Sequence, residues 1–570
     1  MGLAKRGGRA RGRGSRGACG RLWRRGLGLR LLVAALAVAG AASARATETL
    51  HYILEPKFGE GRLHVDLTWE TGQRTQSALR VSEQVGPIDD VPAMLRDVRC
   101  SRSYRRQGAI WVMEHRAGET LRCTYDVVPG RQEFDAWEYM HAPITTAEFF
   151  HGLGNAFLMV PNTGPGVPEE FEVVVRWRLP AGYQAVCSWG SGRSVGARMR
   201  ARDLRHSVYL AGKLARTTVA EGGREVTVAL VDRFGFTVED FAAMTAAIIG
   251  QQCAFMGESN FPDFVVTAIP VGQPVKAGDA RLAGSGLYNS FALFVAPEAR
   301  LDDAVEHLFA HELFHYWNGR VLEAEQPERL VYWFIEGFTD YYALRLLYES
   351  GRWEAKTYAK WINRHVREYY LNPALNATNE EIERDYWNKR GTVGEVAYQR
   401  GLLLGLRWHR LARQKGVSEG VDRLMRTLVN RGREGGLRAA NPVIRQVGVE
   451  TLGAWFADEF DRYVTRAETI ELPADVLAPR LVGRLTEVYA YELGFDRERS
   501  LKERAVRGLV GGSAAERAGL REGDRLVGWT LQNDPDVPTR LQVQRGERVE
   551  TITYYPRGQK RSVVQFESAP

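Results

Sequence analysis

Short segments of alternating apolar and polar residues follow one another from Thr47 to about Arg233, with turn residues between them. The clearest are LHYILEP, GRLHVDLTWE, GAIWVMEH, EEFEVVVRWRLP and REVTVALVDR. A period of two residues is typical of a strand with one buried face. The pattern predicts an all-β N-terminal domain of sandwich or saddle type over residues 47–235. No residue in it suggests catalysis, so a structural or substrate-shaping role is expected.

Helical spacing begins at about Thr237. The segment TVEDFAAMTAAIIGQQCAFMG predicts a helix, DFVVTAIPV a strand, and GDARLAGSGLYNSFALFVAP an apolar strand with a glycine-containing entrance. Two more helices are predicted in DDAVEHLFAHELFHYWNGR and VYWFIEGFTDYYALRLLYES, and a helix-rich region reaches about Asp475. Residues 236–475 are therefore expected to form a mixed α/β lobe and a helical lobe, with a site between them.

The first of these two helices contains His311, Glu312 and His315 in an HExxH pattern. Residues four apart on a helix are separated by about 6 Å along the axis and about 40° around it, so two such imidazoles can bind one metal ion. Glu312 lies beside the pair, where it can take a proton from metal-bound water. The pattern also arises by chance in ordinary amphipathic helices, so the residues that follow decide its interpretation.

His307 lies on the same helical stripe as His311 and His315. Because His307 and His315 are about 12 Å apart along the axis, the three histidines cannot bind one ion. Pairing His307 with His311 would place Leu308, which is no base, at the catalytic position. We therefore expect His307 either to pack in the core or to contact a metal-binding residue without binding the metal itself.

Glu336 and Asp340 lie in the second helix, after a turn that contains Pro327. Glu336 can become a third ligand when this helix packs against the first. Asp340 can accept a hydrogen bond from the far nitrogen of a metal-bound histidine and fix its tautomer; a solvated helix carboxylate is the alternative. Two histidines and a glutamate would also suit an iron oxygenase, but such an enzyme would not need Glu312.

The order of these motifs resembles the gluzincins, thermolysin-like zinc peptidases whose third ligand is a glutamate about twenty residues downstream. A further match is Tyr398 in Tyr-Gln-Arg-Gly at the start of a helical segment. It resembles a tyrosine of the aminopeptidase N and glycyl aminopeptidase families, which hydrogen-bonds the oxyanion of the tetrahedral intermediate. Without the upstream motif, Tyr398 would be interpreted as a core residue.

Nearly all of the sequence after residue 46 resembles the glycyl aminopeptidase family. The resemblance implies a multidomain α+β fold, with a thermolysin-like catalytic domain over residues 236–475 between the β domain and a C-terminal PDZ domain. It implies one Zn²⁺ per polypeptide, held by His311, His315 and Glu336, with Glu312 as the base and Tyr398 at the oxyanion. The implied activity is hydrolysis of peptide bonds in peptide or protein substrates, as an aminopeptidase that acts on N-terminal Gly or Ala.

The sequence departs from this family where the substrate amino group should bind. In the related families, a glutamate on the strand before the zinc helix helps to bind the α-ammonium group. Aligning Ser285, Gly286 and Leu287 with the family's Gly-Gly-Leu places Tyr288 at the glutamate and Asn289 at the following residue. A tyrosine is neutral near its usual pKa of about 10 and cannot supply that charge. An endopeptidase or a peptidase of blocked peptides is therefore an alternative, and Tyr288 could also simply pack on the strand.

The last hundred residues, 476–570, resemble a PDZ domain. The segment YELGFDRERS would contribute Leu493, Gly494 and Phe495 to a carboxylate-binding loop, and SAAERAGL would form its short helix. Such a domain captures the C-termini of polypeptides by strand addition, although an idle groove docked on the catalytic domain is also possible. A non-catalytic peptide-binding protein with a decayed peptidase domain is a further alternative, and the complete metal motif opposes it.

The composition of residues 1–46 indicates an N-terminal leader segment. Residues 1–46 carry one Lys and ten Arg without an acidic residue, which leaves 66 basic against 69 acidic residues in the rest. A basic, nucleic-acid-binding body is therefore not supported, and no nucleic-acid partner is expected. An apolar run and two A-x-A sites follow the arginines, as in a cleaved signal peptide. The run is about half of the ~20 residues that span a bilayer, so we expect an exported, periplasmic or secreted protein without a stable membrane anchor.

Cysteine usage is compatible with export. Cys100 and Cys123 end two strand-like runs and could pair across a hairpin, whereas Cys187 and Cys253 are expected to be free and buried.

Overall fold

The computed structural model describes residues 48–129, 136–231, 234–271 and 282–568. The leader over residues 1–46 lies outside these ranges, and its role in export stays a prediction. A search of the described helices finds none with the length and apolar character needed to span a membrane.

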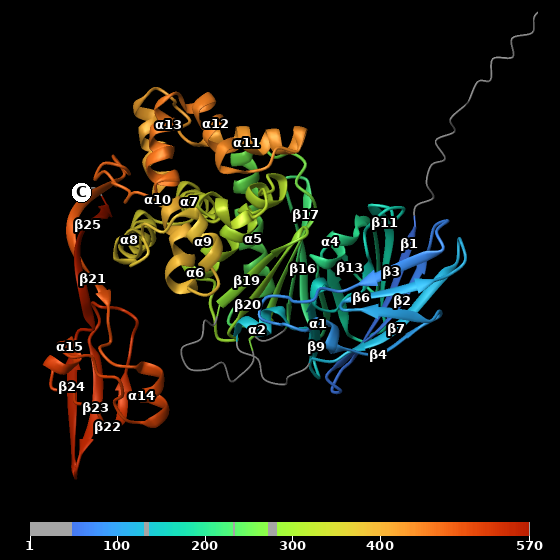
Figure 1. Ribbon diagram of the computed structural model, residues 1–570, viewed down its shortest axis with the longest axis horizontal. Helices are drawn as coiled ribbons and strands as arrows, with labels where there is room; N and C mark the ends of the chain where they lie inside the picture. Colours follow the sequence, from blue (N-terminus) through green and yellow to red (C-terminus); the bar gives the residue numbers. More distant parts are fainter. Residues whose placement is uncertain (1–47, 130–135, 232–233, 272–281, 569–570) are drawn as a thin grey trace, which may run out of the picture. The chain divides into compact units, whose positions relative to one another are not determined.

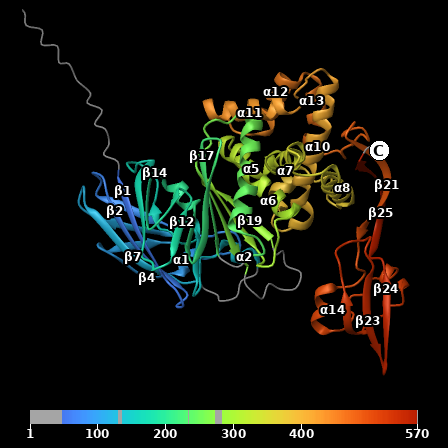
Figure 2. The same cartoon turned by 180° about the vertical axis from the view of Figure 1, so that it is seen from behind.

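Three sheets form the N-terminal part, drawn in blue to teal in Figures 1 and 2. Their strand orders are β14-β11-β1-β2-β7-β4, β10-β3-β6-β5 and β13-β12-β15-β9-β8. Burial alternates along strands such as β1, where Leu50, Tyr52 and Leu54 are fully buried, because every second side chain faces the core. The strands are β1 (Thr49–Lys57), β2 (Arg62–Glu70), β3 (Gln76–Arg80), β4 (Leu95–Cys100), β5 (Tyr104–Gln107), β6 (Ile110–Glu114), β7 (Thr120–Val127), β8 (Ile144–Thr145), β9 (Phe149–Leu153), β10 (Val160–Pro161), β11 (Glu170–Trp177), β12 (Gln184–Cys187), β13 (Gly190–Ser191), β14 (Ser194–Arg200) and β15 (Val208–Gly212).

Within the described ranges, four short helices interrupt these strands, and the alternating pattern does not predict them. They are α1 (Val91–Met94), α2 (Ala136–His141), α3 (Gly154–Phe157) and α4 (Ala201–Arg205). Each is six residues or shorter, so it is too short to show a helical period in the sequence.

A disulfide joins Cys100 and Cys123. The two residues are direct partners on the neighbouring antiparallel strands β4 and β7. The hairpin of β5 and β6 lies between them in the sequence and belongs to another sheet, so the bridge does not close a simple hairpin. Cys187 and Cys253 are free and buried.

A five-stranded sheet of order β16-β17-β18-β20-β19 leads to the metal motif. Its strands are β16 (Leu214–Glu221), β17 (Arg224–Val231), β18 (Phe264–Pro270), β19 (Leu282–Leu287) and β20 (Ser290–Val295). The strand expected before the metal helix is thus a hairpin, which turns at Tyr288 and Asn289 and leaves β19 at the edge of the sheet. Asn289 has a φ of 45°, a left-handed conformation that asparagine tolerates in tight turns. Strands β16 and β17 come from the range predicted for the N-terminal domain but pair into this sheet.

The helices pack on this sheet and on one another. They are α5 (Val238–Met256), α6 (Asp303–Phe314), η1 (Tyr316–Val321), η2 (Glu328–Val331), α7 (Tyr332–Glu349), α8 (Ala355–Leu371), α9 (Asn379–Asp385), η3 (Arg390–Gly394), α10 (Glu395–Gln414), α11 (Asp422–Gly435), α12 (Asn441–Leu452), α13 (Trp455–Phe460) and η4 (Asp461–Thr465). The expectation of β-sheets followed by a helical region is confirmed. Asp302 caps the N-terminus of α6, and its carboxylate accepts hydrogen bonds from the amides of Ala304 and Val305.

Helix α7 is buried around most of its circumference and packs against both α6 and α10 (Figures 1 and 2). Gly337 of α7 faces Gly401 of α10. A Cβ atom at Gly401 would lie 1.7 Å from the carbonyl oxygen of Trp333, and one at Gly337 would lie 2.5 Å from the Cα of Gly401. The close approach of the two helices therefore requires glycine at both positions.

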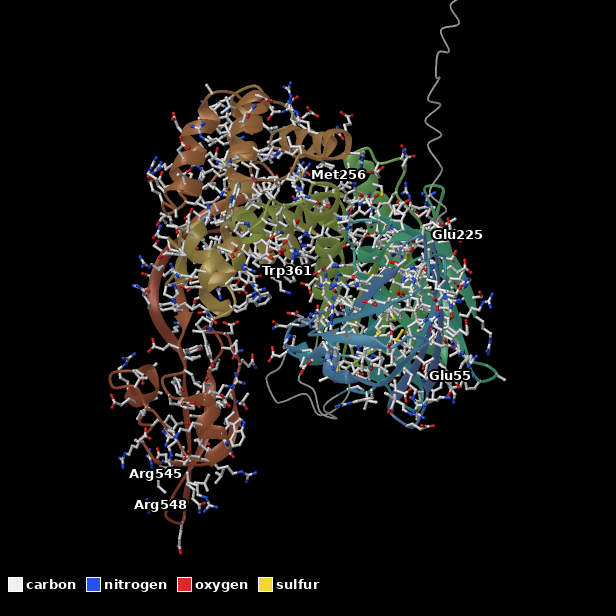
Figure 3. The ribbon with its side chains drawn as sticks, turned by 45° about the vertical axis from the view of Figure 1, so that its right-hand side comes forward. Glu55, Glu225, Met256, Trp361, Arg545 and Arg548 are labelled. Carbon is white, nitrogen blue, oxygen red and sulfur yellow. A yellow bond between two sulfur atoms is a disulfide. The ribbon has the colours of Figure 1, made fainter. Side chains whose placement is uncertain are left out.

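The C-terminal part consists of a long ribbon and a small module, drawn in red in Figure 1. Strands β21 (Leu481–Tyr491) and β25 (Arg557–Ser568) form the ribbon, and β22 (Arg525–Thr530), β23 (Thr539–Arg545) and β24 (Arg548–Tyr554) form the sheet of the module. Arg545 and Arg548 flank the turn between β23 and β24 and are labelled in Figure 3. The buried ribbon residues belong to the same apolar cluster as the helices, namely Leu481, Val488, Val563 and Phe566.

The module has its own apolar cluster, which includes Leu493 and Phe495 of the expected carboxylate-binding loop. Gly494 has a φ of 84°, which glycine adopts readily. The next segment forms helix α14 (Arg497–Glu503), and the expected short helix is α15 (Ala514–Arg517). The residues directly after the loop are therefore helical and do not form a strand edge.

Candidate active site

Three side chains from α6 and α7 converge on one point. The Nε2 atoms of His311 and His315 lie 3.0 Å apart, and Oε2 of Glu336 lies 3.4 Å from the first and 3.5 Å from the second. Metal–ligand bonds of 2.0–2.1 Å in a tetrahedral site place ligand atoms about 3.3 Å apart. The three atoms therefore fit the ligand set of one metal ion, and the nitrogen and carboxylate donors suit zinc.

The site is strongly negative. Burial lowers the pKa of His311, but the carboxylates of Asp340 and Glu336 outweigh burial and hold this pKa well above its usual value. Burial raises the pKa of Glu336, but the two imidazoles outweigh it and the pKa of the carboxyl is far below its usual range. A field that stabilises positive charge so strongly is suited to a bound cation.

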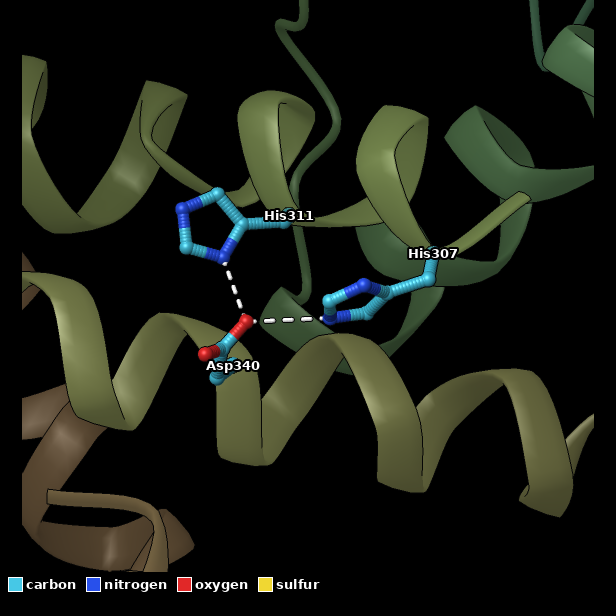
Figure 4. A group of neighbouring side chains, drawn as sticks. All are labelled: His307, His311 and Asp340. Carbon is cyan, nitrogen blue, oxygen red and sulfur yellow. Dashed lines mark hydrogen bonds and ion pairs between the residues drawn. The ribbon is translucent and has the colours of Figure 1, made fainter. Parts of the chain in front are cut away.

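Asp340 contacts both His307 and His311 (Figure 4). Its Oδ1 lies 2.8 Å from Nδ1 of His311 and 3.0 Å from Nε2 of His307. Asp340 is only 3% exposed, so it is not a solvated helix carboxylate. Because a carboxylate accepts hydrogen bonds, Nδ1 of His311 donates and its Nε2 is left with the lone pair that a metal needs. His307 shares this carboxylate and also contacts Trp361, with ring centres 4.4 Å apart.

His315 has a different partner. Its Nδ1 lies 3.1 Å from the carbonyl oxygen of Asn318, which accepts the hydrogen bond. The helix breaks at this point, since Asn318 and Gly319 have non-helical dihedral angles and Gly319 has a φ of 152°. The break turns the Asn318 carbonyl towards the imidazole, so that Nε2 of His315 is also free for a ligand bond.

Glu312 is held by the edge strand of the sheet. Its Oε2 accepts a hydrogen bond of 2.8 Å from the amide of Gly286 in β19. A Cβ atom at Gly286 would lie 2.9 Å from the same oxygen, which explains the glycine there. This contact leaves the other carboxylate oxygen for proton transfer beside the three ligand atoms.

Tyr398 lies on α10, next to the metal site. Its ring is 6.1 Å from the ring of His311 and nearly parallel to it. Burial, together with the charge of Glu336, raises the pKa of Tyr398 well above its usual value, so the phenol keeps its proton as a donor. Its hydroxyl lies 3.2 Å from the hydroxyl of Tyr386 and 3.4 Å from Nη2 of Arg390. The sequence reasoning missed Arg390, because nothing in its local pattern marks it.

Two cavities meet at these residues, and His311, Glu312 and Tyr398 line both. The first cavity, of about 780 Å³, extends past Gly286, Leu287 and Tyr288. The second, of about 800 Å³, extends past Leu282, Ala283 and Gly284 to Trp361 on α8, which is labelled in Figure 3. His311, Glu312 and Tyr398 therefore lie where the two spaces meet.

Tyr288 and Asn289, the residues expected at the amino-binding position, form a cluster with Arg320, and Tyr288 and Arg320 line the first cavity. The guanidinium of Arg320 lies 4.4 Å from the ring centre of Tyr288, and its Nη1 donates a 2.5 Å hydrogen bond to Oδ1 of Asn289. Glu328 also lines this cavity and accepts a 2.8 Å hydrogen bond from the hydroxyl of Tyr332. The sequence reasoning missed Arg320 and Glu328, which lie in the irregular stretch between α6 and α7.

A family model and several solved structures resemble this protein over part or most of its length. Residues 304–393 match the family model of the M61 glycyl aminopeptidases. A search of curated proteins finds no match. Among solved structures, the protein resembles an aminopeptidase N family protein from Idiomarina loihiensis, with a TM-score of 0.67 and 14% identity over 91% of this chain and 98% of that chain. An M1 zinc metallopeptidase from Deinococcus radiodurans matches with a TM-score of 0.49 and 17% identity over 75% of this chain and 95% of that chain.

The first structural match shows that the fold is of the aminopeptidase N type. The segment that matches the M61 glycyl aminopeptidase family model, residues 304–393, contains His311, His315 and Glu336.

Proposed function

We propose that the protein is a zinc-dependent metallopeptidase of the gluzincin type, which acts as an aminopeptidase on small N-terminal residues such as glycine and alanine. The observation that carries the proposal is the convergence of His311, His315 and Glu336 beside Glu312, with Tyr398 next to them and a cavity on either side. The family match over residues 304–393 supports the same activity.

One zinc ion would be held by Nε2 of His311, Nε2 of His315 and Oε2 of Glu336. When bound, zinc acidifies a water molecule and polarises the peptide carbonyl. Glu312 takes the proton from the attacking water and delivers it to the leaving amine. Tyr398 donates a hydrogen bond from its hydroxyl group to the carbonyl oxygen as negative charge develops there. Strand β19 offers an edge along which the substrate backbone can lie.

Aminopeptidase action needs an anion for the α-ammonium group of the substrate, and we propose Glu328 for this role. Glu328 lines the first cavity, and within the described ranges no Lys, Arg or His side chain forms an ion pair with it. The carboxylate would therefore gain a cationic partner when a free N-terminus binds.

A peptidase of blocked or internal bonds is the second candidate, and two observations favour it. The first cavity is about as large as the second, so it has room for more than one residue. Arg320 lies against Tyr288, at the position expected to bind an ammonium group, and its charge would repel one.

We also propose that the C-terminal module is a PDZ domain that binds the C-termini of polypeptides near Leu493, Gly494 and Phe495, and that the protein is exported. A purely binding function is opposed by the complete metal motif.

The test combines metal analysis with activity. Purified protein should contain one zinc per polypeptide, lose hydrolysis of glycyl and alanyl anilides with a chelator, and recover it with Zn²⁺. His311→Ala should lose zinc, whereas Glu312→Gln should retain zinc and lose activity. Full zinc in His311→Ala would exclude this ligand set. If the N-acetylated anilides are cleaved equally fast or faster, the aminopeptidase activity is contradicted and a peptidase of blocked or internal bonds is favoured.

A further inference from the structure

The charges of the first cavity are unevenly paired. Three arginines line it, and two of them share one carboxylate: Nη1 of Arg202 and Nη2 of Arg438 lie 3.2 Å and 3.1 Å from the oxygens of Glu323. Arg202 also lies 3.7 Å from Asp203. The positive charges of these two arginines are therefore compensated within the protein.

Arg320 is different. Among the described residues no carboxylate forms an ion pair with it, and its one side-chain hydrogen bond goes to the neutral amide oxygen of Asn289. Its guanidinium lies 4.4 Å from the ring centre of Tyr288 and 5.6 Å from that of Tyr316. Aromatic rings beside a guanidinium stabilise its charge but accept few of its five N–H groups. Donors are thus left over on a partly buried cation that lines a cavity.

We propose that the first cavity binds a carboxylate of the peptide substrate, with Arg320 as its partner. The inference rests on the proposed peptidase chemistry but differs from the proposed preference for glycine or alanine: it places a glutamate or aspartate on the Tyr288 side of the cleaved bond. A guanidinium can bind a carboxylate through two parallel hydrogen bonds, a geometry that an amide does not reproduce. A glutamine substrate would therefore leave Arg320 uncompensated.

Glu328 defines the form that such a substrate takes. It lines the same cavity and has no basic partner within the described ranges, so the unpaired cation of Arg320 is accompanied by an unpaired anion in this cavity. An acidic residue at a free N-terminus carries both complementary charges. In a blocked peptide, the glutamate side chain engages Arg320 alone.

The experiment compares glutamate with glutamine in two pairs of p-nitroanilides. One pair has a free N-terminus, Glu- and Gln-p-nitroanilide, and the other is blocked, acetyl-Glu-Ala- and acetyl-Gln-Ala-p-nitroanilide. In at least one pair, kcat/KM should favour glutamate by about tenfold at low salt and by less at high salt. Equal values within both pairs would overturn the inference. Failure to cleave these four substrates as well as alanyl anilide would instead contradict the proposed function, and the inference with it.

Variants separate recognition from a structural role of Arg320. Arg320→Gln should abolish the preference for glutamate, Arg320→Lys should retain part of it, and Arg320→Glu should reverse it. Asn289→Ala removes the hydrogen bond to Arg320 but leaves the guanidinium, so this variant should still prefer glutamate over glutamine substrates. Arg384→Gln, on α9 and outside both cavities, is the control for loss of an arginine, and melting temperatures report folding. If Arg320→Gln and Asn289→Ala both slow all substrates equally, Arg320 only holds the turn and the inference fails.

Discussion

At the scale of single residues, the site depends on groups that fix the orientation of other groups. Asp340 contacts no reacting atom, yet it selects the tautomer of His311 through a bond of 2.8 Å. The Asn318 carbonyl does the same for His315, and the Gly286 amide fixes one oxygen of Glu312. In each contact the partner binds one polar atom of the side chain. It leaves Nε2 of each histidine available as a ligand and the second carboxylate oxygen of Glu312 available for proton transfer.

Asp340→Asn should lower the affinity for zinc by about 10- to 100-fold, because the amide cannot hold Nδ1–H of His311 as strongly as a carboxylate. His307→Gln serves as the comparison, since it removes the other histidine from the same carboxylate. The His307→Gln substitution should lower the zinc affinity much less. Titration with a chelating competitor measures both affinities, and equal affinities in Asp340→Asn and the unmodified protein would contradict the role of Asp340.

Tyr398→Phe should lower kcat by about 10²–10³ while the protein stays folded and retains its metal, because one donor to the developing negative charge is lost. Zinc content and circular dichroism provide the controls. Unimpaired turnover of this variant would show that Tyr398 has no part in the reaction.

Arg390→Met should lower kcat by about tenfold with little change in KM. Its guanidinium lies 3.4 Å from the Tyr398 hydroxyl and 5.1 Å from the ring centre, so its charge favours negative charge on the oxygen that Tyr398 contacts. Arg384→Met on the exposed face of α9 should change neither constant. A rise in KM alone would indicate a role in substrate binding only.

At this scale, the sequence shows only what periodicity and spacing can show. Helical geometry predicts that His311 and His315 can bind one metal ion beside Glu312. The second predicted helix adds Glu336 and Asp340 as candidates. Whether Asp340 faced the metal or the solvent required the packing of α7 on α6. Arg320 and Arg390 lie in short π-helical segments and Glu328 lies in a one-turn 3₁₀ helix, and such short segments show no period in the sequence that would predict where their side chains point. They reach the site only through the tertiary fold.

At the scale of elements, long periodic segments were predictable and short ones were not. The helices around His311, Glu336 and Tyr398 formed as expected. The expected single strand before them is the hairpin of β19 and β20, since the glycines of β19 and the turn at Asn289 interrupt the apolar pattern. The glycine contact between α7 and α10 could not be foreseen, because it depends on how two helices cross.

Gly401→Ala should reduce the free energy of unfolding by about 1–3 kcal/mol and also lower activity, since the added methyl group forces α10 away from α7. Gly435→Ala is the matched control. This helical glycine has no heavy atom within 4 Å of its missing Cβ atom, so the substitution should leave stability nearly unchanged or slightly raised. Denaturant titration measures both variants, and equal stabilities would contradict the close packing.

At the scale of the whole molecule, the catalytic part is completed by segments that are far apart in the sequence. Strands β16 and β17 extend its sheet, and the ribbon of β21 and β25 contributes to its apolar cluster. Asn363 of α8 forms two hydrogen bonds with the backbone of Phe566, about 200 residues later. The sequence indicated a change of character near Asp475, but a change in composition does not show which residues share a core.

Phe566→Ala should therefore destabilise the catalytic part by about 3–5 kcal/mol, because Phe566 is 3% exposed and its removal leaves a cavity. Replacing residues 493–554 by a short turn, with the ribbon kept, should have a much smaller effect on the melting temperature and on anilide hydrolysis. An equal loss in both variants would show that the module itself supports the catalytic part.

The contact between Gly337 and Gly401 also limits how this enzyme can evolve. Every substitution at either position adds at least one carbon atom, and the partner, already glycine, cannot become smaller to compensate. A tolerated change would have to displace one helix, which would separate Glu336, next to Gly337, from Tyr398, one turn before Gly401. A change at either of these two positions is therefore coupled to the placement of Glu336 and Tyr398.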